Sequence, residues 1–113
     1  MDDEVEEEQV FMIVEDMPTF KGGGTDKFQK YVYSKLKYPD IARENGISGR
    51  VVVKFVVDQT GQVTDVTILR GVDPALDQEA LRVVRSSPKW APGKQRGRPV
   101  KVQFVFPITF VLQ

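Results

Sequence analysis

Residues 98–112 read RPVKVQFVFPITFVL and contain the longest alternation of apolar and polar side chains in the chain. Apolar residues at every second position predict a strand with one buried face. The buried face would consist of Val100, Val102, Phe104 and Phe106. Pro107 interrupts the pattern, and proline has no N–H for a ladder, so it is confined to the edges, ends and bulges of sheets. We therefore expect a strand with one open side, which is either protected against pairing or used to dock another chain.

The composition fits one small globular domain without catalytic chemistry. The chain has 113 residues, of which 41% are hydrophobic, and it contains no cysteine and no histidine. Disulfides, thiolate metal sites and the commonest general base are therefore excluded. No apolar run approaches the roughly 18 residues of a membrane span, and neither a signal peptide nor a glycine-rich phosphate loop is visible. We predict a protein that is not an enzyme and needs no cofactor or metal.

Charge is unevenly distributed, although 16 basic residues balance 16 acidic ones. Six acidic residues lie within the first eight positions, and none follows Glu79. Residues 1–9 are therefore predicted to be a disordered acidic tail, and the last third a basic surface. A basic surface suggests nucleic acid as one hypothesis. However, Phe104 and Phe106 share the buried face of their strand instead of forming a stacking platform, so we predict no nucleic-acid partner.

Residues 10–24 are predicted to form an extended N-terminal segment with a glycine-rich loop. The apolar run at residues 10–14 has strand character and must be buried, either on the core or along a sheet edge. The glycines at 22–24 cannot hold regular structure. Because unpaired edges invite pairing, we hypothesise that residues 10–14 occupy the open edge of the last strand, in the same chain or in a homodimer, and inhibit docking there.

Two helices are expected before the central strands. Thr25 is predicted to cap a helix with an apolar stripe, which we interpret as a core face rather than as a groove for a partner. The stripe consists of Phe28, Val32 and Leu36. Pro39 suits the first turn of a second, short helix, which Asn45 and Gly46 should end.

A hairpin and a third helix follow. Residues 49–58 are apolar on both faces, as in a central strand, and the turn DQTG at 58–61 leads into a half-solvated second strand. A helix is expected to begin at Asp73, with Asp73 or Asp77 as its cap. Its buried stripe would consist of Leu76, Ala80, Val83 and Val84. We interpret Trp90, between this helix and the last strand, as a core residue.

The order of these elements predicts the topology. A helix between the second and the last strand makes these two strands parallel to each other. Short connections then favour the sheet order second, first, third along the chain, with the last strand at an edge. The expected fold class is α+β, with a small three-stranded, antiparallel-type sheet and helices packed on one face.

The assembled residues resemble one family, the C-terminal domains of TonB, the periplasmic energy transducer of Gram-negative bacteria. The resemblance covers about residues 36–113 and begins at Tyr38-Pro39 and Ala42. It continues, in the order and spacing typical of the family, with Gly46, Gly49, Gly61, Leu76, Asp77, Ala80, Trp90, Pro92, Gly93 and Pro99. On this basis residues 25–113 are assigned as a TonB C-terminal-like domain.

The resemblance implies a non-catalytic domain of a protein that is anchored in the inner membrane, crosses the periplasm and is driven by a proton-dependent motor complex. It implies binding of the TonB box, an extended peptide of outer-membrane transporters, by strand addition, and transmission of the energy for siderophore or nutrient uptake. The anchor and linker of the family are not in this sequence, so we expect a piece of a longer protein that does not itself insert into the membrane. The alternative is a TonB-like sensor or scaffold domain of another envelope protein.

The resemblance places the peptide contact on the last strand. The matching residues are Lys101, Val102, Gln103, Phe104, Val105, Phe106, Pro107 and Ile108, with further contacts expected from Lys37, Tyr38 and Pro39. Backbone groups of successive strand residues point to opposite neighbours. If Pro107 faces the open side, then Lys101, Gln103 and Val105 offer their backbone to the peptide, while Val102, Phe104 and Phe106 pair with the central strand. Alternatively, Pro107 ends the strand and the docking edge is shorter.

Overall fold

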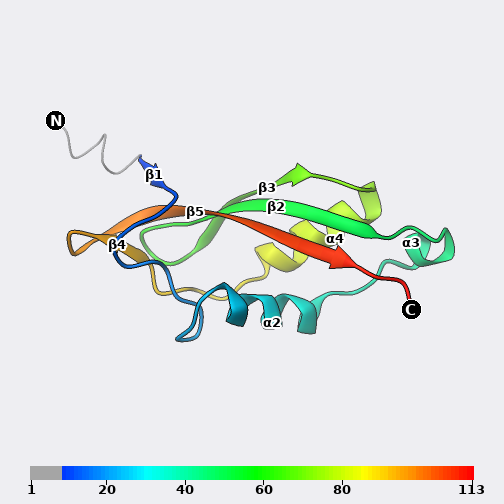
Figure 1. The fold of residues 1–113 in the computed structure, drawn as a ribbon, viewed down its shortest axis with the longest axis horizontal. Helices are drawn as coiled ribbons and strands as arrows, with labels where there is room; N and C mark the ends of the chain where they lie inside the picture. Colours follow the sequence, from blue (N-terminus) through cyan, green and yellow to red (C-terminus); the bar gives the residue numbers. More distant parts are fainter. Residues whose placement is uncertain (1–8) are drawn as a thin grey trace.

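The computed structural model describes residues 9–113, which form an α+β fold with three helices and a mixed five-stranded sheet (Figure 1). The predicted α+β class is therefore confirmed, whereas the predicted acidic tail, apart from Gln9, lies outside the described residues. The elements are β1 (Val10–Phe11), α2 (Thr25–Lys35), α3 (Asp40–Glu44), β2 (Gly49–Val57), β3 (Val63–Arg70), α4 (Pro74–Arg85), β4 (Gly93–Gln95) and β5 (Arg98–Phe110).

Strand β2 lies between β5 and β3 and is antiparallel to both. It pairs with β5 in nine consecutive positions without a register shift, from Gly49 opposite Phe110 to Val57 opposite Val102. Two short strands enlarge the sheet beyond the three strands expected: β1 pairs with the outer edge of β5 in parallel, and β4 forms a hairpin with β5. The expected strand number is therefore wrong, because segments of two or three residues are too short to show alternation.

Helices α2 and α4 pack on one face of the sheet and enclose the core (Figure 1). The predicted helical stripes are confirmed: α4 buries all four of its expected residues, and Leu36 packs against the core as a partly buried side chain. The fully buried core side chains of α2 and β2 are Phe28, Val32, Val51, Val53, Phe55 and Val57. On the opposite face of the sheet, Val52 and Lys54 are only half-buried and Val105 is exposed.

Trp90 occupies the centre of the core, as predicted, with 3% of its surface exposed. Its backbone N–H donates to the carbonyl of Gly61 at 2.8 Å. Gly61 has a φ of +89°, and a Cβ atom there would lie 1.9 Å from the Trp90 carbonyl oxygen, so only glycine fits. The rings around Trp90 are Phe20, Phe28, Phe55 and Phe104.

The segment at residues 10–24 is attached to the chain that leads into β5. Thr19 and Ala91 exchange backbone hydrogen bonds of 3.1 and 2.9 Å, and Asp16 and Lys94 exchange bonds of 3.1 and 2.8 Å. Phe20 is 1% exposed and belongs to the core cluster. Although this segment contains little regular structure, it therefore contributes one of the largest buried side chains.

The structure corrects two predicted helix starts. Gly24, and not Thr25, is the N-cap of α2, because its carbonyl accepts the N–H groups of Lys27 and Phe28 and no side chain caps the helix. Pro39 is the N-cap of α3 instead of lying in its first turn. The predicted end of α3 is confirmed: Asn45 is the C-cap, and Gly46 follows with a φ of +66°.

The predicted cap of α4 and the hairpin turn are confirmed. The Asp73 side chain accepts the Ala75 N–H at 2.9 Å, while Asp77 accepts the N–H of Val72 at 3.0 Å and ties the preceding loop to the helix. In the turn between β2 and β3, Asp58 accepts bonds from the N–H groups of Thr60 and Gln62. These bonds of Asp58 fix the turn that joins β2 to β3.

Candidate functional site: the open edge of strand β5

Strand β5 continues through Pro107 and ends at Phe110. The alternative that Pro107 terminates the strand is therefore wrong. Pro107 lies opposite Val52 within the uninterrupted register. Because proline has no N–H, it fits this position only if its nitrogen points away from β2, towards the open side.

The N–H of Thr109 gives independent evidence for the same orientation. It donates to the hydroxyl oxygen of Tyr33 in α2 at 2.9 Å, and so does not point at β2. Backbone groups alternate along a regular strand, so the two observations fix the direction for all of them. Those facing the open edge belong to Lys101, Gln103, Val105, Pro107 and Thr109. This is the orientation predicted from Pro107, and Val102, Phe104 and Phe106 face β2.

The side chains of the outward-facing residues lie outside the core. Val105 is 48% exposed, Pro107 is also exposed, and Lys101 and Gln103 are half-buried. By contrast, the alternate residues of β5 are mostly buried side chains of the core. They are Val102, Phe104, Phe106, Ile108 and Phe110, of which Phe104 is half-buried. Backbone access and side-chain exposure therefore coincide on the same residues of this edge.

Strand β1 covers one end of the edge. Val10 and Phe11 pair in parallel with Lys101 and Val102, so the hypothesis that this run occupies the edge in the same chain is confirmed for these two residues. Beyond β1, the Sδ atom of Met12 lies 3.3 Å from Nε2 of Gln103. The chain then leaves the edge: Ile13 is 81% exposed, and Asp16 pairs with Lys94 of β4. Two further parts of the hypothesis stay predictions: that this segment inhibits docking, and that it mediates a homodimer.

Tyr33 covers the other end of the edge through its bond to Thr109. No sequence pattern singles out Tyr33, because it lies outside the apolar stripe of α2 and its partner is 76 residues away in the chain. Between β1 and Tyr33, the edge of β5 from Gln103 to Pro107 is uncovered. This stretch is the candidate docking site.

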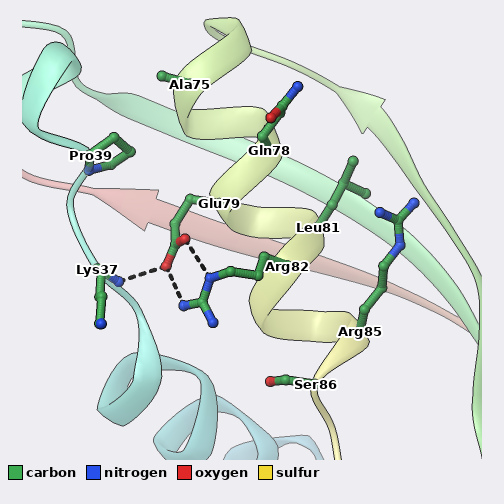
Figure 2. A pocket seen from close by; sticks show the side chains of 9 residues that line it. All are labelled: Lys37, Pro39, Ala75, Gln78, Glu79, Leu81, Arg82, Arg85 and Ser86. Carbon is green, nitrogen blue, oxygen red and sulfur yellow. Dashed lines mark hydrogen bonds and ion pairs between the residues drawn. The ribbon is translucent and has the colours of Figure 1, made fainter.

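The expected contact residues before α3 lie away from this uncovered stretch. Lys37 and Pro39 line an open groove of about 960 Å³ beside α4 (Figure 2). The Tyr38 ring packs edge-on against Phe110, with 5.6 Å between centroids, and its hydroxyl donates to the Ile47 carbonyl. Tyr38 therefore supports the end of β5 from the core side, while its two neighbours face the groove.

Glu79 fastens this connection to α4 (Figure 2). Its carboxylate accepts the backbone N–H of Lys37 at 2.7 Å and two bonds of 2.7 Å from the Arg82 guanidinium. Burial alone would raise the pKa of Glu79, but these hydrogen bonds and the nearby positive charges hold it below its ordinary value. An ionised carboxylate that is already engaged in this way is a structural clamp and not a proton donor.

Residues 9–113 contain no group of three or more potential metal-ligating His, Cys, Asp or Glu side chains. Within the same part of the chain, no helix has the length and apolar character that crossing a membrane requires. The uncovered backbone of β5 can donate and accept hydrogen bonds in the manner of any strand edge.

Comparison with known proteins identifies the family. The family described as "Gram-negative bacterial TonB protein C-terminal" matches residues 34–112. The chain belongs to this family. Protein TonB of Helicobacter pylori strain ATCC 700392 / 26695 is 28% identical over 81 residues, or 71% of this chain and 28% of that protein. Protein TonB of strain J99 is 34% identical over 62 residues, or 54% of this chain and 22% of that protein. The matches thus span about a quarter of these TonB proteins.

Solved structures of TonB C-terminal domains share the fold. The NMR structure of Helicobacter pylori TonB-CTD residues 194–285 has a TM-score of 0.61 at 29% identity, and covers 79% of this chain and 94% of that one. The structure of residues 179–285 has a TM-score of 0.63 at 28% identity, with 79% and 80% coverage. The TonB2 protein of Vibrio anguillarum, with a TM-score of 0.52, 20% identity and coverage of 70% and 76%, shares the fold.

Proposed function

We propose that this chain is the peptide-docking domain of a TonB-type energy transducer, and that it binds the TonB box of outer-membrane transporters by strand addition to β5. The observation that carries the proposal is the uncovered backbone edge from Gln103 to Pro107, which faces away from β2. Membership of the TonB C-terminal family supports it. The contact residues expected from the resemblance are Lys101, Val102, Gln103, Phe104, Val105, Phe106, Pro107 and Ile108. Because β1 pairs with Lys101 and Val102, the peptide would pair with the backbone from Gln103 onwards unless it displaces β1.

The edge suits reversible binding. About five backbone hydrogen bonds, each contributing roughly 0.5–1.5 kcal/mol net, are offset by an association cost of about 4 kcal/mol or more. Pro107 contributes a carbonyl but no N–H, so the number of bonds is lower than the length of the strand suggests. A modest affinity follows, as a coupler that must release its partner requires.

The pairing of β5 with β2 suits the transmission of force. A pull on a docked peptide along the strand direction would load nine consecutive positions of the β2–β5 ladder together. The load would pass directly into the central strand of the sheet. In the proposed setting, the domain acts in the periplasm, and regions outside this sequence provide the inner-membrane anchor and the contact with the motor complex.

Titration of ¹⁵N-labelled protein with synthetic TonB-box peptides tests the proposal. Binding should shift the amide signals of Gln103 and Val105 most strongly, because their N–H groups face the incoming strand. The amides of Val102, Phe104 and Phe106 should stay protected from solvent exchange by β2. A peptide with alternate residues N-methylated is the matched control, since it has the same side chains but lacks donors. If TonB-box peptides shift no amide of β5, the domain acts in another way, as the sensor or scaffold alternative requires.

A further inference from the structure

The bond between Thr109 and Tyr33 assigns a second function to α2 beyond core packing. The Tyr33 hydroxyl accepts the Thr109 N–H at 2.9 Å, and this N–H would otherwise be the next outward-facing donor of the edge after Val105. Pro107, between them, has no N–H. We propose that Tyr33 is a positioning residue that sets where a docked peptide strand ends; this inference rests on the proposed function of β5.

The hydroxyl of Tyr33 retains a donor for a ligand. In the bond to Thr109 it acts as the acceptor, and a phenol can also donate one hydrogen bond. Among the described residues, no acceptor lies in hydrogen-bonding geometry for the Tyr33 O–H, and 39% of the residue is exposed. Tyr31, on the same helix, differs, because its hydroxyl donates to the carbonyl of Ser86 at 2.9 Å.

The Tyr33 hydroxyl, which accepts the Thr109 N–H, can therefore donate its own hydrogen to a ligand at the open edge. A peptide carbonyl arriving at this end of the edge would accept from the Tyr33 hydroxyl in place of the Thr109 N–H. The peptide would be capped there, because the next outward-facing N–H of β5, that of Thr109, is already engaged by the Tyr33 hydroxyl. At the opposite end, β1 blocks the edge at Lys101 and Val102. The ligand that fits is an extended peptide with a free carbonyl at the Tyr33 end.

The distance between the two ends limits the length of this peptide. From Gln103 to Pro107 the strand spans about 13 Å, at roughly 3.3 Å per residue. A peptide of about five residues fills this stretch. Residues added beyond the tyrosine would find no free backbone N–H, so they should add little affinity while Tyr33 is present.

The test compares blocked TonB-box peptides of about five and about nine residues on the wild type, Tyr33→Phe and Tyr31→Phe. In the wild type the two peptides should bind within about twofold of each other. Tyr33→Phe should weaken the shorter peptide about fivefold through loss of one hydrogen bond, while the longer peptide recovers affinity by pairing with the released Thr109 N–H. The Thr109 amide signal should shift on binding in this variant only. Tyr31→Phe is the matched control and should bind as the wild type does.

The outcomes separate this inference from the proposed function. If the wild type binds and the β5 amides shift, but Tyr33→Phe changes neither the affinity for either peptide nor the response of Thr109, the assignment of Tyr33 is wrong and strand docking stands. If neither peptide shifts the β5 amides in the wild type, the proposed function fails, and the inference fails with it. Each phenylalanine variant loses a hydrogen bond of its hydroxyl, but both melting temperatures should stay well above the assay temperature, which excludes loss of folding as the cause.

Discussion

Replacing Val105 by proline should abolish peptide docking while preserving the fold. The N–H of Val105 faces the open edge, so its removal breaks no bond to β2. The side chain is 48% exposed, and Pro107, two residues further on, already shows that β5 tolerates proline on this side. The preceding residue, Phe104, is in the extended conformation that a following proline requires.

The expected magnitudes follow from which bonds are lost. At position 105, the proline variant should differ from Val105→Ala by less than about 1 kcal/mol in the free energy of unfolding, because no ladder bond is removed. At position 106, which faces β2, Phe106→Pro should be less stable than Phe106→Ala by about 1–3 kcal/mol, because a buried carbonyl of β2 loses its donor. Each proline variant is compared with the alanine variant at the same position, so that the loss of the original side chain cancels and the difference reports the lost N–H.

Peptide affinity provides the second half of the test. Loss of one donor and the bulk of the proline ring at the edge should weaken a TonB-box peptide at least about tenfold, or about 1.4 kcal/mol. Urea unfolding measures stability, and a fluorescence or NMR titration measures affinity. If Val105→Pro unfolds the protein while Phe106→Pro does not, the assignment of outward-facing residues is reversed. If Val105→Pro keeps full affinity, the peptide does not pair with this edge.

Three further predictions concern other positions. Pro107→Val should leave the fold unchanged and strengthen peptide binding about two- to tenfold in a titration, because it adds an outward donor; unchanged affinity would place Pro107 outside the docked stretch. Phe20→Ala should destabilise the protein by about 3–5 kcal/mol in urea unfolding, since the ring is 1% exposed; a loss below about 1 kcal/mol would contradict its core position. Burial alone would raise the pKa of Asp58, but hydrogen bonds from Thr60 and attraction by Lys101 lower it from 3.8. The wild type should therefore be more stable than Asp58→Asn in urea unfolding above that pH. This difference in the free energy of unfolding should shrink as the pH falls through the lower pKa of the folded state. A pH-independent difference would contradict this assignment.

The central architecture follows from the sequence because its signals are long and repeated. Alternation over residues 49–57 and 98–106 predicts two strands, and the helical stripes of α2 and α4 predict the face on which each helix packs. Pro107 also indicates which backbone groups face the open edge. Because it has no N–H, its nitrogen must point away from β2, and the groups of the other residues alternate from there along the strand. These inferences depend on local patterns and on one covalent property of proline.

The features that the sequence does not predict depend on contacts between distant segments. β1 and β4 are too short for any period to be visible. Phe20 lies next to polar residues and glycines, and the bonds of Thr19 to Ala91 and of Asp16 to Lys94 bring its segment to the core. Tyr33 acquires its role from an N–H 76 residues away. The backbone direction of the edge is thus predictable from sequence, whereas its two ends are set by tertiary structure.

The edge of β5 is accessible along only part of its length. A long, flat edge with regularly spaced donors is a template for pairing between copies of a chain. Here β1 covers the Lys101 end, Tyr33 engages the donor of Thr109, and Pro107 has no donor at all. Each device removes or occupies backbone groups on the open side, and none interrupts the nine paired positions with β2. What is left is a short stretch around Val105, which offers an extended peptide about five backbone positions.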